Sequence, residues 1–178
     1  LVGIQVPKNE KREFKAFLVE LRTALCRELK LAQKQGELSV RPEFYSVVDQ
    51  MLLAQSHSFM LVTTNWDTVV PYAMRRHIRK TMDGELIPLH IHGSVARQDT
   101  LYLPTEVTKE PYRSHEEDQH IGRLHGDIWR GLEKAHRAVV YGLSLSPLDA
   151  ELCQTLAVGW DNPNLREICV ISPDHELV

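Results

Sequence analysis

The sequence contains little cysteine, no long apolar run and no excess of positive charge. Its three cysteines are too few and too scattered for a disulfide framework, so we expect buried free thiols in a reducing cytoplasm: Cys26, Cys153 and Cys169. No apolar stretch approaches the roughly 20 residues that cross a bilayer, and the start has no signal-peptide pattern. A net charge of −3 gives no electrostatic reason to bind nucleic acid. These absences predict a cytoplasmic protein that binds neither membranes nor nucleic acid.

The length and composition fit one globular domain over residues 1–178. Hydrophobic residues make up 43% of the sequence and charged residues 25%, and no repeat or linker divides it. One basic cluster lies late in a predicted helix, where we expect it to interact with the helix dipole and solvent: Arg75, Arg76, His77, Arg79 and Lys80.

Helical and strand periods alternate along the chain. Apolar spacings predict helices at five places, of which the first is followed by Gly36 as a stop: residues 14–29, 44–52, 67 or 68–80, 116–136 and 147–157. Short apolar, β-prone runs predict strands, including a brief one at 101–103: residues 58–64, 86–92, 138–142 and 168–171. This alternation predicts an α/β fold in which a mostly parallel, Rossmann-like sheet has helices on both faces.

Polar or glycine-rich segments follow four of these strands: TTNWD at 63–67, HGS at 92–94, GLSLS at 142–146 and SPD at 172–174. Any one of them could be an ordinary turn, because such turns favour Gly, Ser, Asn and Asp. Ligands of open α/β sheets bind at the carboxyl ends of the strands. Four such segments at one edge therefore predict a cleft lined with amides and hydroxyls.

The motifs resemble those of a known family. TTNWD is similar to the sirtuin motif Thr-Gln-Asn-Ile-Asp, HGS to the sirtuin His-Gly pair, and GLSLS to its Gly-Thr-Ser segment. The similarity is greater to sirtuin-like domains of bacterial antiphage and NAD-depleting proteins, which read Thr-Thr-Asn-Tyr-Asp, His-Gly-Ser and Gly-Tyr-Ser-Leu. The resemblance covers about residues 58–174, in matching order and strand context.

The resemblance implies an NAD-binding domain that hydrolyses the nicotinamide–ribose bond, with a role in antiphage defence. Cleavage builds positive charge on the ribose, as in glycoside hydrolysis. Asn65 and His92 are the expected catalytic residues. An asparagine amide can orient a ribose hydroxyl or the attacking water, and a neutral histidine can accept a proton near neutral pH.

The resemblance also implies the residues that bind NAD. Asp67 would meet the nicotinamide amide, and Ser172 stands where many sirtuins have an asparagine for the adenosine ribose. Backbone and hydroxyl contacts to the ribose and phosphates would come from the remaining motif residues: Thr64, Gly93, Ser94, Gly142 and Ser144.

Structural roles remain open for several of these residues. Asn65 could cap the following helix, as could Asp67 or Thr68, and His92 could be a half-buried histidine satisfied by the backbone. His90 and His92 would share a strand face, but no third ligand is near, so no metal is expected. Three further histidines are expected on a solvated loop or helix: His115, His120 and His125.

The sequence leaves the activity and the partners open. Sirtuin deacylases hold a structural zinc with two Cys pairs, and this chain has no CxxC, which disfavours protein deacylation. A non-catalytic sensor of NAD or ADP-ribose derivatives would use the same pocket as a hydrolase. A fused or associated effector or sensor domain and a homo-oligomer also remain open.

The glycine-rich loop that holds the pyrophosphate in sirtuin-like domains has no counterpart here. The segment Val2-Gly3-Ile4 has one glycine and leads into a charged helix, which makes no phosphate nest. We therefore expect the natural protein to carry a first strand and a Gly-rich loop upstream of Leu1. We also expect the 178-residue chain alone to bind NAD weakly.

Overall fold

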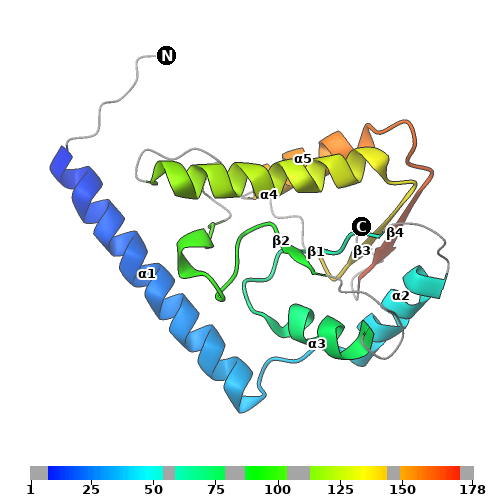
Figure 1. Cartoon of the computed structure of the whole chain (residues 1–178), viewed down its shortest axis with the longest axis horizontal. Coiled ribbons are helices and arrows are strands. Elements are labelled where there is room, and N and C mark those ends of the chain that lie inside the picture. The colour runs from blue at the N-terminus through cyan, green and yellow to red at the C-terminus, as the bar shows by residue number, and fades with distance from the viewer. Residues whose placement is uncertain (1–7, 54–58, 79–86, 104–112, 144–148, 173–178) are drawn as a thin grey trace.

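The computed structural model describes residues 8–53, 59–78, 87–103, 113–143 and 149–172 (Figure 1). In these ranges the chain forms helices, one 3₁₀ turn and short strands in the order α1 (Lys8–Gln35), α2 (Pro42–Leu53), β1 (Val62–Thr63), α3 (Val69–Ile78), β2 (Leu89–His90), η1 (Gln98–Thr100), α4 (His115–Lys134), β3 (Arg137–Tyr141), α5 (Ala150–Trp160) and β4 (Glu167–Ile171). No helix in them is long and apolar enough to cross a membrane.

Local signals at the helix ends account for their boundaries. Gly36 follows α1 with φ 77°, a conformation that glycine adopts without strain, which confirms it as the stop signal. Asp67 Oδ1 accepts a hydrogen bond from Val69 N at 2.8 Å at the start of α3. Ser114 and Glu117 form a complete capping box at the start of α4.

The strands form two parallel pairs. Val62 and Thr63 of β1 lie opposite Leu89 and His90 of β2, and all five residues of β3 pair with β4. The predicted α/β class and parallel pairing are therefore confirmed. The expectation of one Rossmann-like sheet is not, because the described strands form two separate two-stranded sheets.

The predicted strand at 101–103 is wrong. These residues are loop, and their backbone bonds to neighbouring loops instead of to a ladder. Tyr102 N donates to His92 O at 2.9 Å, and the Trp66 indole N–H donates to Tyr102 O at 3.3 Å. Tertiary contacts have replaced the strand pairing that the apolar residues Leu101 and Leu103 favoured.

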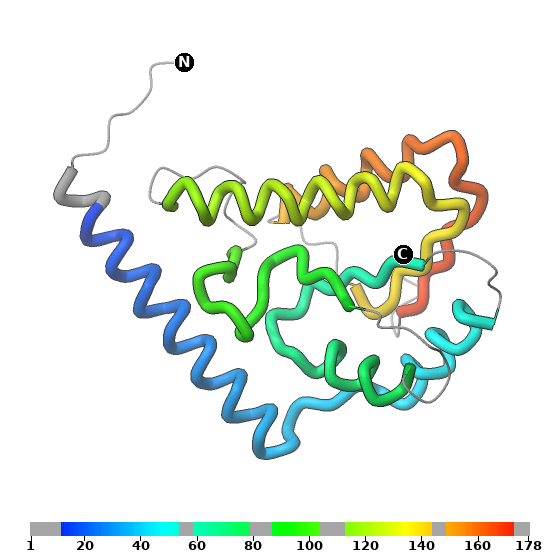
Figure 2. The backbone as a smooth tube through the Cα atoms, viewed as in Figure 1, coloured from blue at the N-terminus to red at the C-terminus, as the bar shows by residue number. Residues whose placement is uncertain are grey.

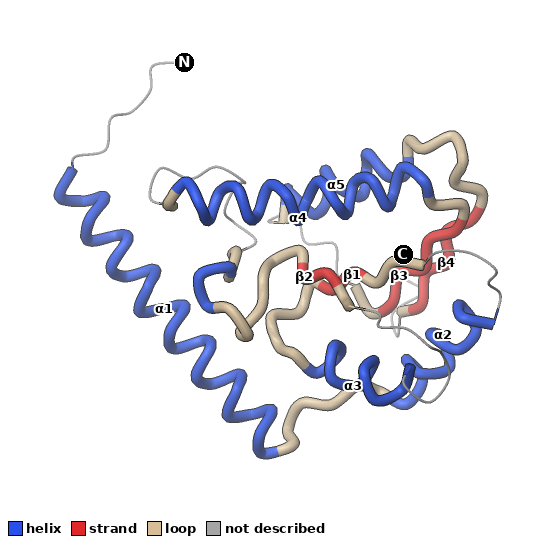
Figure 3. Tube along the Cα trace, in the orientation of Figure 1, coloured by secondary structure: helices blue, strands red, loops and turns tan. Residues whose placement is uncertain are grey.

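Helices cover the strands from two sides (Figures 1 and 3). On one side, Ile128 of α4 and Leu152 of α5 form a core with Ile91, and Val62 and Leu89 pack against it. On the other side, a second core joins α2 and α3 and receives Leu61 and Tyr141 from the strand region: Phe44, Val48, Met74 and Ile78. The two cores therefore place helices on two sides of the strand region, which consists of two small parallel sheets.

Helix α1 runs along a third side of the molecule (Figure 2). Cys26 packs with Val95 and Leu101 in a small core beneath it. Near its end, the Gln33 side chain accepts a hydrogen bond from Thr68 N at 3.1 Å. Helix α1 therefore supports the loops that follow β1 and β2.

Candidate functional site

The loop after β1 holds the backbone of Asn65 firmly and leaves its side chain exposed. Asn65 N donates to Thr63 Oγ1 at 3.1 Å, and Asn65 O lies 2.8 Å from His90 Nδ1, which donates to this carbonyl. In the described part of the chain, the Asn65 carboxamide makes no hydrogen bond. Asn65 is therefore no helix cap, and its amide is available to a ligand.

The loop after β2 is shaped by Gly93. Its φ is 71°, and a Cβ built there would lie 1.8 Å from Thr100 O. The glycine is therefore required by a close approach of the protein's own backbone. Ser94 Oγ accepts from Ala96 N at 3.2 Å, and Val95 N donates to Trp66 O at 2.8 Å. The last bond joins this loop to the loop that carries Asn65.

His92 is buried, with 3% of its surface exposed, and its ring is fixed by a carboxylate. Its Nε2 lies 2.7 Å from Asp149 Oδ2. A carboxylate only accepts hydrogen bonds, so Nε2 carries the proton and Nδ1 of the neutral ring keeps its lone pair. Nδ1 is buried and has no hydrogen-bond partner among the described residues. The ring thus presents one uncommitted proton acceptor.

The surroundings of His92 keep it neutral. Burial lowers its pKa below the ordinary value of 6.5, although the Asp149 carboxylate acts in the opposite direction. Its ring lies parallel to that of Tyr102, with centroids 5.7 Å apart. The Arg113 guanidinium carbon lies 4.7 Å from the Tyr102 ring centre. These contacts enclose a neutral imidazole in a polar, rigid setting.

Asp149 is a site residue that the sequence analysis missed. It is buried at the N-cap of α5, where its Oδ1 accepts a hydrogen bond from Leu152 N at 3.2 Å. An aspartate before the apolar run of α5 is a recognisable cap signal. Its contact with His92 joins segments 57 positions apart, which no local pattern indicates.

The second sheet brings Gly142 to the same region. Gly142 N donates to Ile171 O at 2.8 Å, extending the ladder past the end of β3. Leu143 packs against the core that contains Ile91, which places this strand end beside that of β2. Gly142 has φ 58°, and a Cβ there would meet nothing within 4 Å. Ser172 directly follows β4, and Ser144 lies outside the described residues.

The other polar residues of this region differ in their surroundings. Asp67 caps α3, as one of the alternatives stated, and Thr64 is half-buried at the end of β1. The expectation of a solvated His125 is wrong, because its Nε2 donates to Ile91 O at 3.1 Å inside the core. The apolar face of α4 carries His125 inward with Ile121 and Ile128.

Metal ligands do not gather in the described ranges, where no group of three or more His, Cys, Asp or Glu side chains could hold an ion. No protein-family model, curated protein or solved structure matches this chain. The resemblance of its motifs to a family therefore depends on the motif residues themselves.

Proposed function

We propose that this chain binds NAD at the carboxyl ends of its parallel strands and hydrolyses the nicotinamide–ribose bond. The observation that carries the proposal is the state of His92, whose Nε2 is held by Asp149 while Nδ1 remains free to accept a proton. The exposed carboxamide of Asn65 follows the neighbouring strand, and a hydrogen bond joins the two loops. Open space beside Gly142 supports a ligand at the same edge.

In this proposal each residue acts on the substrate in a distinct way. The bond between ribose C1′ and the pyridinium nitrogen breaks, the electron pair leaves with nicotinamide, and water adds to C1′. Asn65 orients the ribose or that water, and His92 Nδ1 accepts the proton that the water loses. The products are nicotinamide, ADP-ribose and one proton. Burial of His92 keeps the acceptor away from bulk water.

Asp149 acts in this proposal as a positioning residue. Its carboxylate fixes the tautomer of His92, and its second oxygen is anchored to the first turn of α5. Serine proteases also orient a histidine base with a buried carboxylate, although there the carboxylate holds Nδ1 and here it holds Nε2. The resemblance assigns the remaining contacts to NAD to Thr64, Asp67, Gly93, Ser94, Ser144 and Ser172.

The direct test is to incubate the purified protein, at its full natural length, with NAD and to measure free nicotinamide by chromatography. Turnover that yields ADP-ribose in equal amount supports the hydrolase. A protein that binds NAD and leaves it intact is the alternative, a sensor of NAD or ADP-ribose derivatives. Transfer of acyl groups from lysine peptides would instead support the third candidate, a protein deacylase.

Asp67→Ala is expected to weaken NAD binding more than ADP-ribose binding, because only NAD carries the nicotinamide amide that Asp67 is proposed to meet. Loss of one charge-assisted hydrogen bond corresponds to about tenfold in affinity. The measurement is calorimetric titration of both ligands with the variant and the wild type. Because Asp67 also caps α3, equal losses for both ligands would identify it as a structural residue only.

The pH dependence of nicotinamide release should report the lowered pKa of His92. Only neutral His92 accepts a proton, so kcat/KM should hold as pH falls through about 6.5 and decline at lower pH. Asp149→Asn removes the carboxylate that raises this pKa and should move the decline further toward acid. A decline centred above about 6.5 would contradict the assignment of His92 as the base.

A further inference from the structure

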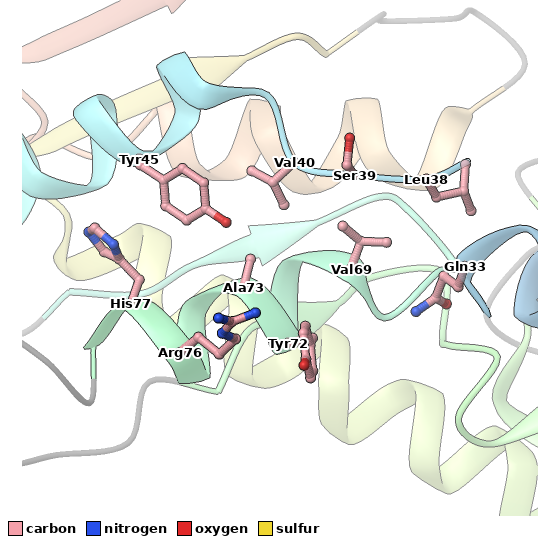
Figure 4. A pocket seen from close by; sticks show the side chains of 10 residues that line it. All are labelled: Gln33, Leu38, Ser39, Val40, Tyr45, Val69, Tyr72, Ala73, Arg76 and His77. Carbon is pink, nitrogen blue, oxygen red and sulfur yellow. The ribbon is translucent and has the colours of Figure 1, made fainter. Parts of the chain in front are cut away.

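A cavity of about 500 Å³ lies between the end of α1, the start of α2 and the outer side of α3 (Figure 4). None of its lining residues belongs to the proposed NAD site. Its aliphatic part is formed by Leu38, Val40, Val69 and Ala73, and the rest of the lining is polar or aromatic. Its volume is in the range of about 300–1,000 Å³ that is typical of small-molecule pockets.

The charge of the lining favours an anion. It includes the guanidinium of Arg76 and no acidic side chain. Asp49, which lies next to His77, is engaged by the imidazole Nε2 at 2.5 Å. The Arg76 guanidinium forms no ion pair or hydrogen bond with any described residue. A guanidinium beside a cavity, with N–H groups that no described residue engages, matches the paired oxygens of a phosphate.

The aromatic residues of the lining favour a planar group. The ring of Tyr45 is braced by Phe44, with centroids 6.4 Å apart, and by His77, with centroids 5.0 Å apart. Tyr72 contributes a second phenol and is 64% exposed. A cavity of about 150 Å³ accommodates benzene, so this cavity exceeds the needs of a single-ring acid about threefold. A planar base with a sugar and a phosphate is a better match in size.

We propose that this cavity binds a nucleoside monophosphate, with the base against Tyr45 and the phosphate on Arg76. The site is separate from the strand-end site and goes beyond the proposed hydrolysis of NAD. Arg75 offers a matched comparison because it precedes Arg76 on α3, carries the same charge and is also exposed, but does not line the cavity.

The test is calorimetric titration of the wild type and variants with AMP. We expect saturable binding, weakened by about tenfold or more in Arg76→Ala and unchanged in Arg75→Ala, because Arg76 lines the cavity and Arg75 does not. Adenosine and inorganic phosphate should each bind more weakly than AMP, since each lacks one half of the recognised chemistry.

Three results would overturn the proposal: no saturable AMP binding, equal losses in the two arginine variants, or a loss in Asn65→Ala alone. The last would place AMP at the strand ends instead. Absence of nicotinamide release would overturn the proposed hydrolase and leave the AMP experiment unaffected. The two proposals therefore fail independently.

Discussion

Nicotinamide release should fall by about 100-fold to 10,000-fold in His92→Ala, the range that a general base contributes. Loss of the proton acceptor affects kcat, while NAD binding by the rest of the site should change little. Asn65→Ala should lower kcat by about 100-fold or more, because the reacting groups lose their orientation. Both rates are measured by chromatography at matched fractions of folded protein.

Replacement of buried His92 also leaves Asp149 without its partner, so a stability control is needed. His92→Gln keeps a hydrogen-bond donor for Asp149 and should be equally inactive. His125→Gln is the matched control for the loss of a buried histidine. His125 is also buried, and its ring centroid lies 5.6 Å from that of Tyr102. Near-normal release in a folded His92→Gln protein would remove His92 from the mechanism.

Gly93→Ala should destabilise the fold by about 2–5 kcal/mol, which combines the strain of positive φ with overpacking. The new Cβ would lie 1.8 Å from Thr100 O, so the η1 turn and the loop carrying His92 would have to move apart. The free energy of unfolding is measured by urea denaturation followed by circular dichroism.

Gly142→Ala separates these two causes. Gly142 also has positive φ, 58°, but its Cβ would enter open space, so we expect a loss of only about 1–2 kcal/mol from backbone strain. Equal losses in the two variants would mean that the loop after β2 adjusts freely to a side chain. The close approach of Thr100 to Gly93 would then have no energetic weight.

The sequence predicted the helices and the longer strands because their signals are local. Apolar spacing predicted a helix within α1, and the apolar run 138–142 predicted β3, whose observed bounds each differ by one residue. The extent of β1 was overestimated: residues 59–61 are apolar yet lie outside the strand, although Leu61 O still accepts a hydrogen bond from Leu89 N at 2.9 Å. Sheet continuity depends on which strands exchange backbone hydrogen bonds, and apolarity alone does not determine that.

The candidate site was predictable where it depended on position after a strand. Asn65, His92 and Gly142 all follow strands, as the motifs indicated. The protonation state of His92 was not predictable, because it arises from Asp149 on a distant helix and from burial. His125 was missed for a related reason, since one histidine on an amphipathic helix can face water or the core.

Strand β4 has a consequence for the behaviour of the protein in concentrated solution. Four of the five residues in its sequence EICVI are apolar and three are β-branched. Ile168 and Val170 are nevertheless 44% and 45% exposed, and the outer edge of β4 pairs with no described strand. Such a strand is a template for pairing between molecules. The net charge of −3 is near the low end of the range of about 2–8 in magnitude that keeps small domains dispersed, so mutual repulsion opposes such pairing only weakly. Colloidal stability should therefore depend on this five-residue segment more than on the cores that hold the fold together.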